Sequence, residues 1–215
     1  MSDYSGSRFE SAKRGAGALL SGALSALIVM VTMLAVMWLV EGVDFFLGGT
    51  LDYEYGIRGW DPDGLLGILF APFLHVGFGH LMANSVPLLV LGFLAGLRDI
   101  RKFLWATVLI IFIGGIGTWL LSGPMTYTVG ASGLVFGYFG FIVARGIFDH
   151  RLLDILIAIG VGVAYWGILA GVLPNQPGIS WQGHLFGLIG GVVAAWVLRR
   201  KKRELPPATS YPYLS

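Results

Sequence analysis

Long apolar runs separated by short polar connections are the feature that most restricts how this chain can fold. Six runs can be traced, at residues 19–40, 81–97, 103–121, 132–145, 152–173 and 184–198. Each is close to the length that an α-helix needs to cross a bilayer, about 20 residues. In lipid, a spanning segment must pair its own backbone N–H and C=O groups, which these runs achieve as helices. We therefore predict an all-α membrane protein, a bundle of six transmembrane helices.

The composition supports a membrane protein and excludes several classes of site. Of the 215 residues, 56% are hydrophobic and only 12% are charged, whereas a soluble domain has about a quarter charged. The chain contains no cysteine, which excludes disulfides, thiol catalysis and thiolate metal sites. Its basic residues flank the apolar runs, so the net charge of +2 reflects membrane topology. We expect no nucleic-acid partner.

The polar segments divide the chain into three parts. Residues 1–17 are predicted to be a cytoplasmic N-terminal tail, residues 18–200 the six-helix membrane domain, and residues 201–215 a basic, polar cytoplasmic tail. Within the membrane domain, an acidic first loop at 41–65 leads into an apolar stretch at 66–80 that is broken by proline and glycine. We predict that this first external region is partly helical and lies at the interface or re-enters the membrane.

Basic residues predict the orientation of the bundle. Of the 14 Lys and Arg residues, only Arg58 lies on the side opposite the termini, which leaves thirteen on the terminal side. The positive-inside rule then predicts that both termini are cytoplasmic and that the acidic loop is external. The lipid bilayer is the expected environment. No transit-peptide pattern is recognisable, which favours a prokaryotic plasma membrane.

Polar residues inside three of the predicted spans lie at a similar depth. Ser132 precedes the charged boundary Arg145 by 13 residues, and His184 precedes Arg199 by 15. At 1.5 Å per residue, both lie roughly 20 Å from the cytoplasmic boundary. Asn84, 14 residues before Arg98, reaches the same level. Polar residues at membrane depth usually face a cavity or one another, so we expect these side chains to converge in a water-filled pocket open to the outside.

This convergence predicts a serine nucleophile with a histidine base. Glycines on the fourth and sixth runs would let the two backbones approach closely, so that the Ser132 hydroxyl reaches the His184 imidazole. Donors for an oxyanion would come from His80, Asn84 and the start of the helix at Ser132. Two other interpretations stay open: the glycines pack against different helices, or Phe136, which we expect on the imidazole, is an ordinary lipid-facing aromatic. The glycines assigned to this packing are Gly130, Gly133 and Gly187.

With these motifs in order, the chain resembles the rhomboid family of intramembrane serine proteases. The resemblance covers about residues 19–200 and rests on three motifs: Gly130-Ala131-Ser132-Gly133, His75 with His80 and Asn84, and Gly183-His184-Leu185-Phe186-Gly187 followed by Gly191. It implies a rhomboid-type six-helix fold and a Ser132–His184 dyad. It also implies an oxyanion held by His80, Asn84 and the Ser132 amide, with no metal or cofactor.

The resemblance also implies the substrates, transmembrane proteins cleaved in or near a helix. A gate for their lateral entry would involve Trp166 and the loop from Pro174 to Gln182. Two positions depart from the common family pattern: Leu66 and Gly67 stand about where many members have a Trp-Arg pair, and Gly183 replaces an alanine. Two other functions are weighed: a non-catalytic rhomboid-like protein that binds client helices, and a small-solute transporter. Intact Ser132 and His184 argue against the first, and the apolar cytoplasmic halves of the spans argue against the second.

Overall fold

The structure is a computed structural model that describes residues 3–124, 126–174 and 177–200. In this part of the chain, the long helices are α1 (Asp3–Phe46), α4 (Phe78–Gly96), α5 (Ile100–Leu121), α6 (Ser132–Asp149), α7 (Leu152–Tyr165) and α8 (Trp181–Val197). Five segments are long and apolar enough to cross a membrane, one of them made of α7 and the turns that continue it. Helix α8, with 17 residues, is at the short end of the spanning range. The all-α membrane fold predicted from the sequence is confirmed.

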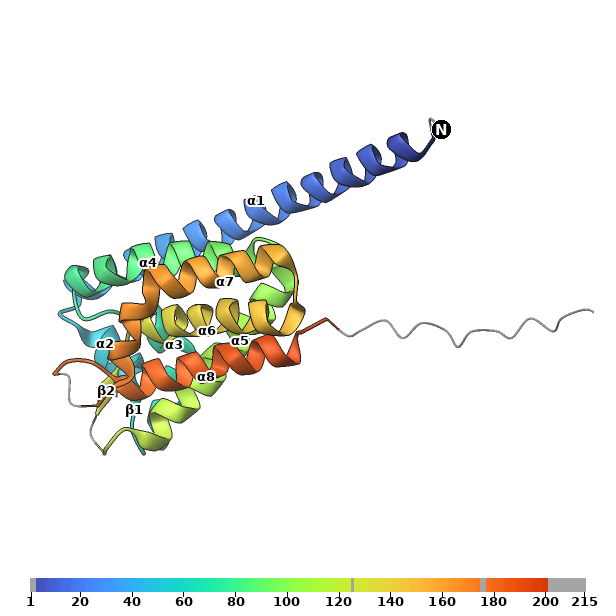
Figure 1. Cartoon of the computed structure of the whole chain (residues 1–215). Coiled ribbons are helices and arrows are strands. Elements are labelled where there is room, and N and C mark those ends of the chain that lie inside the picture. The colour runs from blue at the N-terminus through green and yellow to red at the C-terminus, as the bar shows by residue number, and fades with distance from the viewer. Residues whose placement is uncertain (1–2, 125, 175–176, 201–215) are drawn as a thin grey trace, which may run out of the picture.

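Helix α6 is the centre of the bundle. It contacts α4, α5, α7 and α8. Of the residues in its apolar stretch, 61% are buried inside the protein, against 6% for the apolar stretch that begins with α7. Figure 1 shows α6 between α7 and α8, with α2, β1 and β2 at one end of the bundle and the end of α8 at the other. Most side chains of α7 therefore face lipid, apart from the buried Asp154 and Val161, whereas α6 lies inside the bundle with Ser132 as its first residue.

The first loop is partly helical, as predicted. It contains α2 (Thr50–Tyr55), β1 (Ile57–Arg58), the 3₁₀ turn η1 (Pro62–Leu66), α3 (Gly67–Phe70) and the 3₁₀ turn η2 (Ala71–Phe73). Strand β1 pairs antiparallel with β2 (Tyr127–Thr128), with Ile57 opposite Thr128. Two indoles add crossed bonds: Trp60 Nε1 donates to the Leu120 carbonyl at 2.8 Å, and Trp119 Nε1 donates to the Asp61 carbonyl at 2.9 Å. The loop is thus attached to the segment that leads into Ser132.

Three helix boundaries differ from the prediction. Helix α1 begins at Asp3, so the residues predicted to be a tail continue the helix that follows. The fifth run changes at Trp166 from α-helix to the 3₁₀ turns of η3 (Trp166–Val172). Helix α8 begins at Trp181, three residues before His184, because the Ser180 side chain caps it by accepting from the Gly183 N–H. The predicted C-terminal tail, 201–215, lies outside the described residues, as do residues 175–176 of the loop from Pro174 to Gln182 that was expected to form the gate.

Asp154, in the first turn of α7, belongs to a buried ion cluster. Asp154 is 2% exposed and lies between two arginines from other elements. Arg98 is 2.7 Å from its Oδ2, and Arg145 is 3.4 Å from its Oδ1. Arg145, itself buried, also donates to the carbonyls of Ala95 and Leu94. This ion cluster joins the ends of α4, α6 and α7 on the side of the bundle opposite Ser132.

Asp154→Asn is expected to lower stability strongly. Removing one partner of a buried ion pair leaves the other charge unpaired and costs about 3–5 kcal/mol. Thermal unfolding of the purified protein in detergent measures the loss. Glu54→Gln is the matched control. It also removes one carboxylate, but Glu54 is exposed and takes no part in the packing of the bundle. Equal melting temperatures for Asp154→Asn and Glu54→Gln would contradict this account of the cluster.

Candidate active site

The structure brings the Ser132 and His184 side chains together. The Oγ of Ser132 and the Nε2 of His184 are 2.8 Å apart. Ser132 is the first residue of α6, and His184 lies in the first turn of α8. The chain enters α6 through Gly130, which has a φ of +120°, a conformation that a residue with a β-carbon rarely adopts. His184 is buried, so the contact lies inside the protein.

A backbone carbonyl determines which nitrogen of His184 carries the proton. His184 Nδ1 is 2.9 Å from the carbonyl oxygen of Gly171 in η3. A carbonyl oxygen can only accept a hydrogen bond, so the proton of the neutral ring is on Nδ1. Nε2 is then an acceptor, and the Ser132 hydroxyl donates to it. In serine proteases with three catalytic residues, a carboxylate orients the histidine in this way; here a peptide carbonyl occupies that position.

Phe136 packs against one face of the His184 ring. Its ring stacks on the His184 imidazole, with centroids 4.1 Å apart and an interplanar angle of 12°. A β-carbon at position 171 would lie 2.8 Å from His184 Nδ1 and 2.9 Å from Phe136 Cζ. The absence of a side chain at Gly171 therefore permits both the carbonyl contact and the stacking. The two rings and the Gly171 backbone fix the orientation of the imidazole.

Glycine contacts bring α6 and α8 close enough for the Ser132–His184 bond. A β-carbon at Gly187 would overlap the Gly133 carbonyl, and one at Gly191 would overlap the Gly137 carbonyl. A β-carbon at Gly133 would be 3.4 Å from the Gly183 carbonyl, already a tight contact. The two helices therefore meet backbone to backbone, as the glycine spacing predicts.

Two histidines pack beside the turn that leads into Ser132. The His80 ring lies against Gly130, where a β-carbon would be 2.6 Å from its Cε1. The His75 ring packs edge-on against His80, with centroids 5.1 Å apart. His75 Nε2 accepts from the backbone N–H of Ala131 at 3.2 Å. His75 thus holds the segment just before Ser132, while His80 faces the turn at Gly130.

Asn84 is placed one helical turn after His80, and its side chain is largely buried. The hydrogen bond recorded for its amide goes to the His80 carbonyl in the same helix, at 3.1 Å. Ser132, His184 and Phe136 are therefore in direct contact through the His184 ring. His80 lies beside them, against Gly130. Asn84 is linked to the group through His80.

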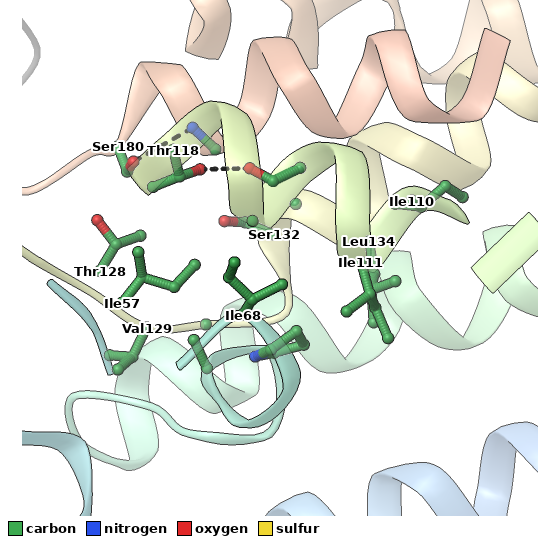
Figure 2. A pocket seen from close by; sticks show the side chains of 17 residues that line it. Ile57, Ile68, Ile110, Ile111, Thr118, Thr128, Val129, Ser132, Leu134 and Ser180 are labelled. Carbon is green, nitrogen blue, oxygen red and sulfur yellow. Dashed lines mark hydrogen bonds between the residues drawn. The ribbon is translucent and has the colours of Figure 1, made fainter. Parts of the chain in front are cut away.

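Two adjoining cavities connect this site with the outside. A small one, about 50 Å³, is lined by Ser132 together with residues of α5, the first loop and the start of α8. Figure 2 shows Ser132 between Thr118 and Ser180 on one side and Ile57, Ile68 and Val129 on the other. A larger cavity, about 580 Å³, contains His80 and shares Thr128, Val129 and Ser180 with the first. A buried water needs roughly 10–15 Å³, so both cavities have room for water near the serine.

The pKa of His75 predicts a pH dependence of stability. Burial, assisted by the nearby His80, lowers the pKa of His75 from its ordinary value of 6.5 to about 4. The folded protein therefore resists protonation, and stability should fall as pH decreases from about 6.5 towards 4. His75→Gln keeps an acceptor for the Ala131 N–H and should flatten this slope. Melting temperatures of both proteins across this range test it, and an identical pH dependence would contradict the role of His75.

Sequence reasoning missed two of these contacts. No pattern marks the Gly171 carbonyl, because a backbone oxygen in an apolar run carries no side-chain signal. His75 was noted as part of a motif, but its bond to Ala131 was not anticipated. Among the described residues, no group of three or more His, Asp and Glu side chains is arranged to hold a metal ion.

Comparisons with known proteins show which family this chain resembles in sequence. Residues 62–201 match the family model for the rhomboid domain. The chain is 45% identical over 184 residues to the uncharacterized protein Rv1337 of Mycobacterium tuberculosis, covering 81% of this chain and 76% of that protein. It is 30% identical over 138 residues to the Bacillus subtilis protein YdcA, named provisionally as a rhomboid protease, covering 61% and 66%. It is 33% identical over 143 residues to rhomboid-like protease 5 of Toxoplasma gondii, covering 59% and 15%.

Proposed function

Because this chain belongs to the rhomboid family, we propose that it is an intramembrane serine endopeptidase that cleaves peptide bonds in or near transmembrane helices of membrane-protein substrates. The observation that carries the proposal is the 2.8 Å contact between Ser132 Oγ and His184 Nε2, with Gly171 accepting from Nδ1. A serine whose hydroxyl donates to a correctly oriented imidazole is the arrangement of an activated nucleophile.

The reaction would proceed through an acyl-enzyme. As Ser132 Oγ attacks the substrate carbonyl carbon, its proton moves to His184 Nε2. The imidazolium keeps its Nδ1–H bond to Gly171, which favours the charged ring in the same orientation. His184 then gives the proton to the leaving amine as the C–N bond breaks. Water enters from the cavity beside Ser132 and attacks the ester carbon while His184 Nε2 accepts its proton. The bond between the acyl carbon and Ser132 Oγ then breaks, and His184 returns the proton to Oγ.

The negative charge on the attacked oxygen would be stabilised by donors around the start of α6. The Ala131 N–H already donates to His75. The first N–H groups of a helix have no partner within it, which applies here to Ser132 and Gly133, since the Leu134 and Val135 N–H groups donate to the Ala131 carbonyl. We assign the Ser132 amide and the side chains of His80 and Asn84 to this role. His80 lies against Gly130, two residues before the nucleophile. Removing one such donor typically lowers kcat by 10² to 10³.

The cavities limit the substrates. The space beside Ser132, about 50 Å³, suits a small side chain at the cleaved position rather than an aromatic one. A helical peptide bond is hydrogen-bonded within its own backbone, so the substrate must unwind locally to present its carbonyl. We therefore propose that substrates have small residues near the external end of a transmembrane helix and features that destabilise the helix there.

The proposed topology has both termini in the cytoplasm and the cavities open to the external side of a bacterial plasma membrane. The chain has no native cysteine, so single reporters are straightforward to introduce. In intact cells, a membrane-impermeant maleimide should label Glu54→Cys in α2 and leave Arg101→Cys at the start of α5 unlabelled until the membrane is opened. The reverse labelling pattern would contradict this topology.

Reconstitution with a substrate tests the function. Full-length protein in liposomes is mixed with a model protein that has one transmembrane helix and a small residue near its external end. The wild type should produce two fragments, and mass spectrometry should place the cut near that residue. A wild-type protein that retains the substrate uncut would support the alternative, a rhomboid-like protein that binds client helices without cleaving them.

A further inference from the structure

A cavity of about 290 Å³ lies at the end of the bundle opposite Ser132. Every residue that lines it is charged: Arg98, Asp99, Lys102, Arg145, Asp149, Arg151, Asp154 and Arg200. These residues come from the turn between α4 and α5, from the turn between α6 and α7, and from the end of α8. Five helix ends thus surround one charged cavity, which takes no part in the proposed proteolysis.

The charges in this cavity do not balance. Five cationic and three anionic side chains leave an excess of two positive charges. Asp154 is already engaged by Arg98 and Arg145, and Asp149 Oδ1 accepts from the backbone N–H of Arg200. Lys102 Nζ donates to the Leu198 carbonyl. The carboxylates and the lysine are therefore partly satisfied from within the protein.

Two guanidinium groups remain without a recorded partner. Among the described residues, neither the Arg151 nor the Arg200 side chain has a hydrogen bond or ion pair, although both line the cavity. A guanidinium group presents a planar fork of donors that matches the oxygens of a phosphate. Two such groups across a cavity with net positive charge form a suitable receptor for one phosphate group.

The position of the cavity points to a lipid phosphate. It lies where the apolar parts of α4, α5, α6, α7 and α8 end, which is the level of the headgroups when these helices span a bilayer. Basic pockets between transmembrane helices at this level bind anionic headgroups. We propose that this cavity binds the phosphate group of an anionic phospholipid, held by Arg151 and Arg200. The bound lipid would link the start of α7 to the end of α8.

Lipid binding to purified full-length protein tests the site. Native mass spectrometry in detergent, with added phosphatidylglycerol or phosphatidylcholine, measures retained lipid and apparent affinity. The test variant is Arg151→Gln/Arg200→Gln. The control, Arg101→Gln/Arg199→Gln, removes the same charge near the same end, but Arg101 does not line the cavity and Arg199 lies over the Trp196 ring. The test variant should lose about tenfold or more in affinity for phosphatidylglycerol, whereas the control stays close to wild type.

Two results would overturn the proposal. Equal losses in the two variants would show that anionic lipid is attracted by the diffuse charge of this end rather than by the cavity. The rise in melting temperature of the wild type is also measured with phosphatidylglycerol and with inorganic phosphate alone. An equal rise with the two would identify a soluble phosphate as the ligand. Neither readout depends on substrate cleavage, so the lipid site and the proposed protease activity can fail separately.

Discussion

Ser132→Ala, His184→Ala and the double variant are expected to lose cleavage to nearly the same extent, by about 10⁴-fold or more. The reason is that the hydroxyl and the imidazole, 2.8 Å apart, would act in one proton transfer. Once either group is removed, the other has nothing left to contribute. Initial rates of substrate cleavage in liposomes measure the three losses.

Ser85→Ala is the matched control for this comparison. Ser85 is also a serine in a spanning helix, but its hydroxyl bonds to the Leu81 carbonyl and the Trp38 indole, away from His184. Its cleavage rate should stay near that of the wild type. Losses that multiply in the double variant would contradict the account, because multiplication means that the two residues act independently.

Gly187→Ala is expected to damage both stability and activity. A single methyl at this position would overlap the Gly133 carbonyl, so α6 and α8 must separate. Overpacking of this kind costs about 1–3 kcal/mol. A displacement of about 1 Å between catalytic groups can lower the rate by 10²-fold. Thermal unfolding and the cleavage rate should therefore both change.

Gly162→Ala makes the same chemical change where it should do no harm. Gly162 lies in α7, and a β-carbon there would meet nothing within 4 Å. In a helix interior alanine is favoured over glycine, so this variant should be neutral or slightly more stable. Equal effects of Gly187→Ala and Gly162→Ala would mean that the close approach of α6 and α8 does not position the candidate site.

Residue counts and glycine spacing together were sufficient to predict the contact between Ser132 and His184. Helix rise converts the distance from Ser132 to Arg145, and from His184 to Arg199, into depth, and both side chains proved to lie at one level. The glycine spacing on the same two helices then indicated which faces meet. Both arguments work because an α-helix has a fixed rise and a fixed number of residues per turn, even where its ends are not predicted correctly.

Other features could not be predicted because they depend on tertiary contacts without a sequence pattern. The Gly171 carbonyl reaches His184 only because the fifth run changes to 3₁₀ turns at Trp166, and apolar periodicity does not reveal that change. Asp154 lies in the first turn of α7, where the sequence does not indicate whether a carboxylate is exposed. It is buried because Arg98 and Arg145, far from it in the sequence, converge on it.

The first loop shows how one family feature is replaced. Where many rhomboid proteins would have a Trp-Arg pair, this chain has Leu66 and Gly67. A β-carbon at Gly67 would overlap the backbone of Gly56, so the loop packs there through its backbone. Trp60 and Trp119 then fix the loop to α5 by their crossed indole bonds. The anchoring of this loop therefore comes from other residues, and only the structure reveals them.

Covalent labelling of Ser132 tests the central claim most directly, because it needs no knowledge of the natural substrate. The wild type, reconstituted in liposomes, is treated with a fluorophosphonate, and the modified residue is identified by mass spectrometry. We predict one adduct, on the Ser132 hydroxyl, and loss of labelling in His184→Ala. An adduct on another serine, or an unchanged labelling rate in His184→Ala, would contradict an activated Ser132.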